Sequence, residues 1–434
     1  LALWIAGYMV VPLCTFAVLG KRIGQLSRIT GAITLPELLR ERFQSPLLGM
    51  AASALMIFIL AFSLIAQFKA GALILQLVLP GLPQGGTMIY DKSPAFIYGL
   101  VIFSVVVVSY TVYGGFLAAV WTDLFQSVLM AIGVLIMFPL ALRHAGGLEA
   151  GTRAGIEAVG PGFALAPGGG DIAFLPVALA FSYFCMWSIA GMGQPATLLR
   201  LMAFKDTATL LHAMFLLAVY NAAIYIPLVL IFICARAILP GLEKPDEVMP
   251  RMALAVANPL VAGVILAAPF GAVMATVSGY LVQISSALVQ DVYHHVRPHA
   301  SETTLRRLSH LGIVGVACVS ACGAVFSPPY LQAIVVFAGG AAACAYLFPA
   351  IMAAFWKRGT ATGALVSMLG GVLTVLVLYV VGWVTIPDNR AWDPVNPGGI
   401  APWVWGLSIS AVLGIVVSLL DRAPKSELLD RLFE

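Results

Sequence analysis

The most constraining feature of the sequence is a series of long apolar runs, each long enough to cross a lipid bilayer as a helix. A helix needs about 20 residues to cross a hydrocarbon core of ~30 Å at ~1.5 Å per residue. Eleven runs meet this requirement, near residues 2–20, 48–80, 95–113, 121–142, 174–192, 208–237, 257–290, 308–327, 331–355, 361–384 and 402–420. We therefore predict an all-α, polytopic membrane protein with about eleven spans.

Composition excludes the main alternatives to a helical membrane protein. Hydrophobic residues make up 61% of the 434 residues, and charged residues only 10%. A soluble domain of this length could not bury so much apolar surface, whereas a lipid bilayer solvates it directly. A transmembrane β-barrel would show segments of roughly ten residues with alternating polarity, and the sequence has none. The small net charge of +4 gives no indication of nucleic-acid binding.

Lysine and arginine residues predict the orientation, because they concentrate in cytoplasmic loops. If the loop 21–45 is cytoplasmic, fifteen of the 23 basic residues lie on the cytoplasmic side, seven lie outside, and Lys69 lies within a span. This orientation places residue 1 outside and the tail 421–434 in the cytoplasm. The longest external connections, 143–173 and 385–401, are rich in Gly and Pro, so we expect little regular structure in them.

Four segments, in order along the chain, carry a resemblance to a known family. They are 114–123 (GGFLAAVWTD) followed by Gln126, 193–195 (GQP) followed by Arg200, 267–293 (from AAP to DVY), and 356–359 (WKRG). Together they resemble the sodium:solute symporter family, and the similarity extends over nearly the whole chain. The pantothenate and monocarboxylate branches are the most similar, and the stretch from 238 to 269 resembles the pantothenate branch in particular.

The resemblance implies a LeuT-type fold, in which two five-helix repeats of inverted topology hold the solute near the middle of the membrane. Residues 1–142 would form the first repeat without its first helix, 174–355 the second repeat, 361–420 peripheral helices and 421–434 a cytoplasmic tail. In the family the first core helix is discontinuous and supplies carbonyl oxygens to sodium. The sequence opens directly in an apolar run, so we expect that N-terminal sequence is missing.

The resemblance also implies a sodium site on the run 257–290. In the family, two neighbouring hydroxyl residues bind sodium together with a carbonyl one turn earlier. The matching positions are Ala275, Thr276 and Ala272, so one hydroxyl is missing here, and Ser278 could replace it. Alternatively, the hydroxyls bond back to their own helix or join neighbouring helices. Asp123 matches a family residue on the sodium exit path, although a carboxylate at a helix start also suits a capping role.

Lys69 is the most unusual residue, because it lies in an apolar run, two residues after Gln67. A cation at the centre of a membrane helix costs at least ~2.5 kcal/mol, and no Asp or Glu is expected at its depth. Three interpretations stay open. Lys69 and Gln67 bind the carboxylate of an anionic solute, Lys69 replaces part of the sodium requirement as a built-in cation, or Lys69 snorkels or is held by backbone carbonyls.

The run 174–192 carries three further candidate solute-binding residues, Tyr183, Trp187 and Ser188. Trp187 matches a family position that faces the solute. Aromatic side chains with a polar atom suit a gate, because they exclude water and can still form hydrogen bonds, but ordinary packing explains them equally well. Gly191 and Gly193 indicate a close helix approach or a break in the helix.

These observations predict sodium-coupled import of a small anionic solute, such as pantothenate or a monocarboxylate, by alternating access across a bacterial plasma membrane. The six cysteines all lie in apolar runs and are expected to be packing residues. The enzyme motifs H-E-x-x-H and G-x-S-x-G do not occur, so we do not expect an enzyme. Two alternatives stay open: a symporter-like sensory module, and a proton-coupled or sodium-independent transporter that uses Lys69.

Overall fold

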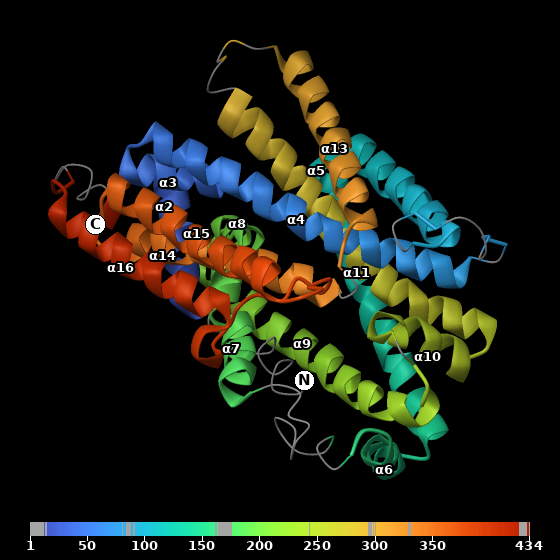
Figure 1. Ribbon diagram of the computed structural model, residues 1–434. Helices are drawn as coiled ribbons and strands as arrows, with labels where there is room; N and C mark the ends of the chain where they lie inside the picture. Colours follow the sequence, from blue (N-terminus) through green and yellow to red (C-terminus); the bar gives the residue numbers. More distant parts are fainter. Residues whose placement is uncertain are drawn as a thin grey trace.

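The computed structural model is helical throughout most of the chain that it describes. The described residues are 13, 15–79, 81–83, 88–89, 92–160, 163, 176–242, 244–293, 297, 299, 301–328, 331–424 and 432–433. Among these residues there is no β-strand, and only an isolated bridge joins Ile89 and Lys92. Figure 1 shows long helices packed across one another, with shorter helices between their ends. The all-α prediction is confirmed.

Several long helices begin with a capping side chain followed by proline. Ser45, Ser93 and Asn258 each accept a hydrogen bond from the backbone N–H three residues later. Proline at the first helical position costs no hydrogen bond, because the backbone N–H that it lacks would have no partner within the helix at this position. The elements are η1 Phe16–Gly20, α2 Lys21–Thr30, α3 Leu35–Phe43, α4 Pro46–Val78, α5 Pro94–Ala145, α6 Leu148–Val159, α7 Val177–Ser188, η3 Ala190–Gly193, α8 Pro195–Met202, α9 Thr207–Ile238, η4 Pro245–Glu247, α10 Val248–Val256, α11 Pro259–Ser286, η5 Ala287–Tyr293, α13 Glu302–Val325, α14 Leu331–Phe355, α15 Ala361–Thr385, η6 Pro397–Gly399 and α16 Pro402–Leu420.

Nine helical segments of the described chain are long and apolar enough to cross a membrane, and each coincides with a predicted run. They are Pro46–Val78, Pro94–Gly114, Val120–Ala145, Thr207–Ile238, Pro259–Val289, Glu302–Val325, Leu331–Phe355, Ala361–Thr385 and Pro402–Leu420. The predicted span 2–20 lies largely outside the described residues, which include only 13 and 15–20 of it. The eleventh predicted span, 174–192, is a broken helix.

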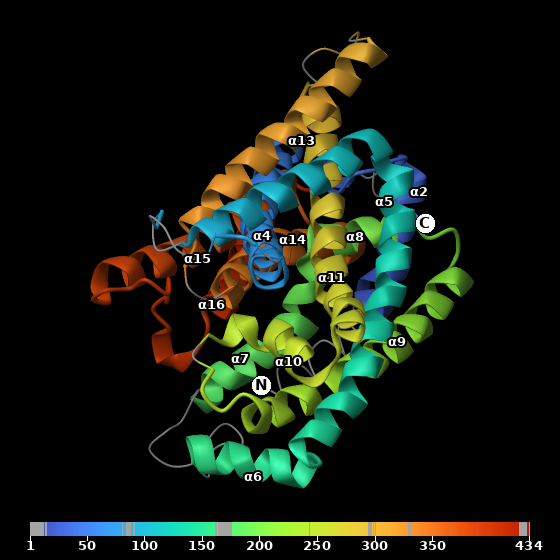
Figure 2. The ribbon, with the colours of Figure 1, turned by 90° about the vertical axis from the view of Figure 1, so that its right-hand side faces the viewer.

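Helix α5 differs from the prediction, because its two spans are joined without a loop. The helix is continuous from Pro94 to Ala145, whereas the sequence predicted an interruption between residues 113 and 121. The two halves run in different directions, so the helix bends between them (Figure 2). Helices bend where glycines weaken them, and Gly114 and Gly115 lie at this point.

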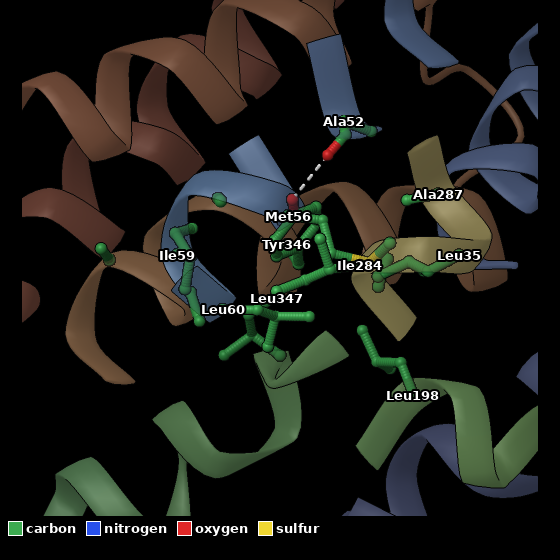
Figure 3. Close-up of a cluster of buried hydrophobic side chains, with 14 of the residues drawn as sticks. Leu35, Ala52, Met56, Ile59, Leu60, Leu198, Ile284, Ala287, Tyr346 and Leu347 are labelled. Atoms are coloured by element: carbon green, nitrogen blue, oxygen red, sulfur yellow. Dashed lines mark hydrogen bonds between the residues drawn. The ribbon is translucent and has the colours of Figure 1, made fainter. Parts of the chain in front are cut away.

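Helix α14 forms the centre of the bundle. Its most apolar window is 83% buried, against 17–44% for the other candidate spans. The run 339–345 consists of small residues, which let neighbouring helices approach closely where lipid supplies no hydrophobic driving force. Tyr346 is fully buried and donates its hydroxyl to the carbonyl of Ala52 in α4 at 2.8 Å (Figure 3). The packing of α14 therefore fixes the helices around it.

Two arginines join the short helices α2 and α3 to the C-terminal end of α14. Arg22 Nε donates to the carbonyl of Ala354 at 2.9 Å, and Arg42 Nε donates to the carbonyl of Ala353 at 3.2 Å. Arg42 is fully buried, and its burial, together with the charge of Arg22, lowers its pKa to about 10. Arg42 thus stays protonated at neutral pH and satisfies a carbonyl that a helix end leaves without a partner.

The connection 143–173 contains a helix that the sequence analysis did not predict. Helix α6 packs against α9, and its residues Glu149 and Arg153, one turn apart, form an ion pair at 2.9 Å. Such a pair adds only ~0.3–0.5 kcal/mol, so the contact with α9 matters more. The expectation of little regular structure in this connection was wrong. It rested on the Gly and Pro content, whereas the residues between the glycines and prolines favour a helix.

The predicted span 174–192 is interrupted in its C-terminal part, and residues 174–175 lie outside the described chain. Helix α7 ends at Ser188, η3 follows, and α8 begins at Pro195. Gly193 lies so close to α14 that a Cβ atom there would be 2.8 Å from the Cα atom of Ala343. The structure therefore combines a helix break with a close helix approach, which Gly191 and Gly193 indicated as alternatives.

This close approach predicts that Gly193→Ala destabilises the protein by ~1–3 kcal/mol, because the α14 backbone must shift. Gly315→Ala in α13 is the matched control. No atom lies within 4 Å of its added Cβ, so helix propensity should make it neutral or slightly stabilising. Thermal unfolding of both purified variants in one detergent measures the difference. Equal Tm values for the two variants would contradict the packing at Gly193.

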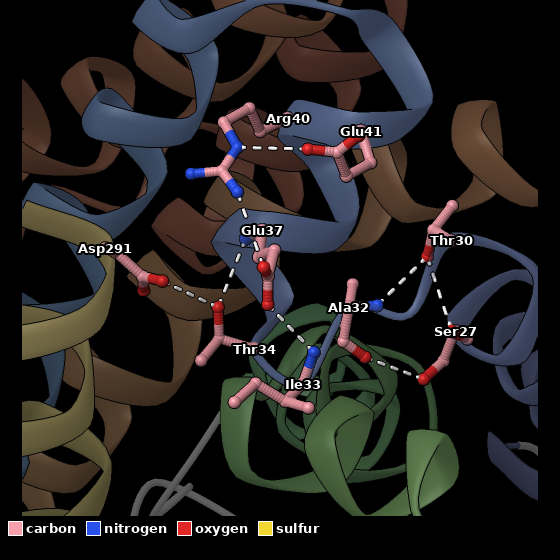
Figure 4. Close-up of polar contacts among 9 residues, drawn as sticks. All are labelled: Ser27, Thr30, Ala32, Ile33, Thr34, Glu37, Arg40, Glu41 and Asp291. Atoms are coloured by element: carbon pink, nitrogen blue, oxygen red, sulfur yellow. Dashed lines mark hydrogen bonds and ion pairs between the residues drawn. The ribbon is translucent and has the colours of Figure 1, made fainter. Parts of the chain in front are cut away.

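A buried polar contact joins the α2–α3 connection to η5. Thr34 Oγ1 donates to Asp291 Oδ1 at 2.9 Å and accepts the N–H of Glu37 at the start of α3 (Figure 4). Asp291 is 7% exposed and lies beyond the candidate span that ends at Val289. Burial raises the pKa of Asp291 from 3.8 to about 6, and the negative charge of Glu37 acts in the same direction.

The raised pKa of Asp291 predicts a pH-dependent stability. The folded chain binds this proton more tightly than the unfolded chain, so the contribution is fully present below about pH 4 and is lost as the pH rises through about 6. The Tm of wild type relative to Asp291→Asn should fall over this interval. Glu302→Gln, which neutralises an exposed carboxylate at the start of α13, is the control. A pH-independent difference between wild type and Asp291→Asn would exclude the raised pKa.

Candidate functional site

A polar cluster lies between α5 and α11, which pack against each other. Tyr110 of α5 donates its hydroxyl to the carbonyl of Met274 in α11 at 3.0 Å. The side chains of Ser278 and Gln126 lie near this hydroxyl, and Asp123 lies within electrostatic range of it. The α5–α11 polar cluster is defined here as Tyr110, Asp123, Gln126 and Ser278.

Two oxygens of the cluster are buried and have no hydrogen-bond partner in the described part of the chain. They are Asp123 Oδ1 and Gln126 Oε1, which lie three residues apart on α5. A buried acceptor without a partner costs ~1–3 kcal/mol, and a charged group costs more. Arg200 of α8 acts on Asp123 electrostatically. A cation bound through oxygen ligands would remove the cost of both acceptors.

The four α11 residues predicted to bind sodium fall on two faces of the helix. Ser278 is fully buried, follows Met274 by one turn and belongs to the α5–α11 polar cluster. Ala272 and Thr276 lie one turn apart on another face, where Thr276 donates its hydroxyl to the carbonyl of Ala272 at 2.9 Å. The structure therefore brings Ser278 together with the cluster and separates Ala272 and Thr276 from it.

The second face of α11 remains a predicted ion site. Ala272, Ala275 and Thr276 are half-buried, and the carbonyl of Ala275 accepts the hydroxyl of Ser278 at 3.1 Å. The back-bonded hydroxyl of Thr276 matches the alternative in which such residues satisfy their own helix.

Tyr183 and Trp187 of α7 lie in an aromatic cluster. They pack beside Phe62 of α4 and Phe337 of α14, whose ring centroids are 4.9 Å apart. Ser188 donates its hydroxyl to a carbonyl one turn earlier in α7, at 3.2 Å. Phe62 is thus the residue of α4 that lies in one cluster with Tyr183 and Trp187, whereas Lys69 contacts Pro328 and Asp246.

The break between α7 and α8 is held against α14 by a side-chain hydrogen bond. Gln194 Nε2 donates to the carbonyl of Gly339 at 3.2 Å. A break at membrane depth frees backbone polar groups, which must be satisfied inside the protein or line a cavity. Discontinuous helices of this kind carry the binding sites of many secondary transporters, so the break is a candidate solute-binding region.

Lys69 has a carboxylate partner that the sequence analysis did not anticipate. Its Nζ donates to the carbonyl of Pro328 at 2.7 Å and lies 3.7 Å from Asp246 Oδ2. The expectation was wrong because Lys69 lies toward the C-terminal end of α4, which reaches the connection that carries Asp246. The contact with Pro328 matches the interpretation of a cation held by a backbone carbonyl. Gln67 is half-buried on the same helix.

Tyr110, Gln126 and Asp246 were missed as candidate site residues. Gln126 occurs in the segment that carries the family resemblance, and Tyr110 is a polar residue in an apolar run, so both gave a weak signal. Tyr110 and Gln126 become candidate ligands only when it is known which faces of α5 and α11 contact each other. A helix that is apolar on all sides has no hydrophobic periodicity from which the contacting face could be predicted. The role of Asp246 depends on a contact between distant connections.

Several curated proteins are similar to this chain. The sodium/pantothenate symporter of Escherichia coli is 29% identical over 362 residues, which cover 83% of this chain and 72% of that protein. The sodium/proline symporter of Haemophilus influenzae is 28% identical over 414 residues, or 92% of this chain and 76% of that protein. The osmoregulated proline transporter OpuE of Bacillus subtilis is 26% identical over 431 residues, or 97% and 81%.

A solved structure of a sodium-coupled sialic acid symporter, in its substrate-bound outward-open state, has the same fold. The TM-score is 0.65 at 16% identity, and the match covers 98% of this chain and 90% of that protein. The predicted LeuT-type helical bundle is thereby confirmed. The model of the sodium:solute symporter family matches residues 2–371. The chain therefore belongs to the sodium:solute symporter family.

Proposed function

We propose that this protein couples the inward movement of sodium to the import of a small organic solute that carries a carboxylate. The family consists of sodium-coupled transporters, so the chain is a transporter and not an enzyme. The observation that carries the proposal is the α5–α11 polar cluster, where oxygens of Asp123 and Gln126 are buried and have no hydrogen-bond partner among the described residues. A bound cation would complete this arrangement.

The chemistry of the cluster suits sodium. Small hard cations bind carboxylate, carbonyl and hydroxyl oxygens, and the cluster offers the carboxylate of Asp123, the amide oxygen of Gln126 and the hydroxyls of Tyr110 and Ser278. One negative charge among neutral oxygens matches a monovalent ion, which would neutralise Asp123 in a low-dielectric environment. We infer a second ion position at Ala272, Ala275 and Thr276.

We place the solute beside the break between α7 and α8. Tyr183, Trp187 and Ser188 lead into this break, and the aromatic pair can exclude water while keeping polar atoms available. Pantothenate and proline, the solutes in the names of similar proteins, both carry a carboxylate, which supports a carboxylate-bearing solute. The contacts of Lys69 with Pro328 and Asp246 favour a role for Lys69 other than solute binding.

The sodium gradient supplies enough free energy for this transport. One positive charge crossing 100 mV is worth ~2.3 kcal/mol, and a tenfold sodium gradient adds ~1.4 kcal/mol. Coupled one to one, these terms support a several-hundred-fold accumulation of a neutral solute. An anionic solute brings its own negative charge, so a second sodium ion would restore the electrical contribution.

The transport cycle that we propose is alternating access. Residues 1–142 and 174–355 would form the two inverted repeats, and the bundle end with α2 and α3 would face the cytoplasm, as the lysine and arginine distribution indicates. The nine apolar helices found in the described part of the chain and the bacterial relatives identify an integral membrane protein, which we assign to the plasma membrane. The two ends would open in turn around the α5–α11 polar cluster.

Transport by the purified protein in proteoliposomes tests the function. An inward sodium gradient should drive uptake of labelled pantothenate, proline or a monocarboxylate, and Asp123→Asn should lower the uptake at least ~10-fold, because it removes the only formal charge of the cluster. Gln76→Leu, which removes an amide outside the cluster that bonds to Ser93, should retain it. Equal uptake in choline with an imposed proton gradient would contradict sodium coupling.

Sodium binding can be measured without a solute. A ligand that binds only the folded state adds about 1.4 kcal/mol of stability at ten times its Kd, so the Tm of wild type should rise in sodium chloride relative to choline chloride. Asp123→Asn and Gln126→Leu should reduce this rise, whereas Gln76→Leu should not. A rise that persists in both cluster variants would place the sodium elsewhere.

A further inference from the structure

Lys69, Asp246 and the start of α14 form one set of contacts. Asp246 Oδ2 lies 3.7 Å from Lys69 Nζ and accepts the backbone N–H of Leu331 at 3.1 Å. Lys69 also donates to the carbonyl of Pro328, in the α13–α14 connection, at 2.7 Å. A single carboxylate thereby links α4, η4 and α14, which are far apart in the sequence. We call this set of contacts the Lys69–Asp246 clasp.

The two charged side chains of the clasp differ in their access to water. The side chain of Lys69 is 4% exposed, whereas that of Asp246 is 20% exposed. Asp246 belongs to a short connection between α9 and α10 that contains Pro240, Gly241 and Pro245, and no atom lies within 4 Å of a Cβ added at Gly241. The carboxylate therefore covers Lys69 from a connection that is exposed at Gly241.

A buried ion pair suits a contact that must open and close. The attraction between the two charges is largely offset by the cost of removing them from water, so the pair contributes little net stability. If Asp246 moved away, water would enter and hydrate Lys69, and the open form would not contain a dry, unpaired cation.

We propose that the Lys69–Asp246 clasp is the closing contact of a gate at this end of the bundle. Access from this end requires Asp246 to leave Lys69 and the start of α14. The proposal rests on the proposed transport function, since alternating access is what requires this end to open. It also gives a reason for a lysine inside an apolar run.

Thiol labelling of a buried reporter tests the gate in purified protein in lipid nanodiscs. Ser327 is 4% exposed and precedes Pro328, so Ser327→Cys, in a background with the six natural cysteines replaced, should react with a soluble maleimide only when the clasp opens. Lys69→Met and Asp246→Asn should each raise the labelling rate about tenfold, which corresponds to ~1.4 kcal/mol and is typical of residues in direct contact.

A double-mutant cycle shows whether the two residues act through each other. Lys69→Met combined with Asp246→Asn should label at about the rate of either single variant, since each alone already removes the pair. Glu247→Gln is the matched control, because this neighbouring acid pairs with Arg251 and Lys244 and not with Lys69. It should change the rate less than about twofold.

Two results would overturn the gate: unchanged labelling in both single variants, or independent effects that multiply to about a hundredfold in the double variant. If Lys69→Met does not fold, Asp246→Asn decides alone, because a partly exposed carboxylate is neutralised there without a cavity. The labelling assay does not depend on transport, so the two proposals can be rejected separately. Sodium-driven uptake by the wild type, together with unchanged labelling in the single variants, would reject only the gate. The expected increase in labelling without any uptake would reject only the proposed solute transport.

Discussion

In a bundle surrounded by lipid, a polar side chain must find its partner inside the protein or in a bound ion, because hydrocarbon offers none. This constraint explains the arrangement of Lys69 on Asp246 and Pro328, and of Thr276 on its own helix. The α5–α11 polar cluster departs from it, since Asp123 and Gln126 keep buried oxygens that have no hydrogen-bond partner within the described ranges of the chain. An ion site requires such a departure, because side chains that satisfied one another completely would leave no ligand for the ion.

Helix α14 organises the rest of the bundle, because charged side chains hold both of its ends. At its start, the N–H of Leu331 donates to Asp246, and at its end, carbonyls accept hydrogen bonds from Arg22 and Arg42. Both contacts complement the helix dipole, which favours a negative charge at the start and positive charges at the end. The elements that carry these charges therefore hold α14 at both ends, and the small residues in its middle allow close packing of the neighbouring helices.

Hydrophobicity alone predicted the fold class, because length and apolar content decide which segments cross a bilayer. Nine of the eleven predicted spans are confirmed in the described part of the chain. Predictions failed where tertiary contacts decide. Helix α6 depends on its contact with α9, and the partner of Lys69 comes from a distant connection. The family resemblance singled out Asp123 and Ser278, but Tyr110 joined them only once the facing sides of α5 and α11 were known. Residue types identify candidate ligands, whereas tertiary packing determines which of these candidates lie close enough to form one site.

The clasp and the ion cluster must communicate if one is a gate for the other. A chain of aromatic rings leads from the clasp to α11: Phe68, next to Lys69, meets Phe103 of α5 edge to face at 5.5 Å, and Phe103 meets Phe270 of α11 at 5.7 Å. Gly71 permits this packing, because an added Cβ would overlap the ring of Phe103. Close-packed interiors have low compressibility, so a displacement of one of these rings is transmitted to its neighbours. If the departure of Asp246 from Lys69 shifts α4, these rings would transmit the shift to α5 and α11, which carry the oxygens proposed to bind the ion.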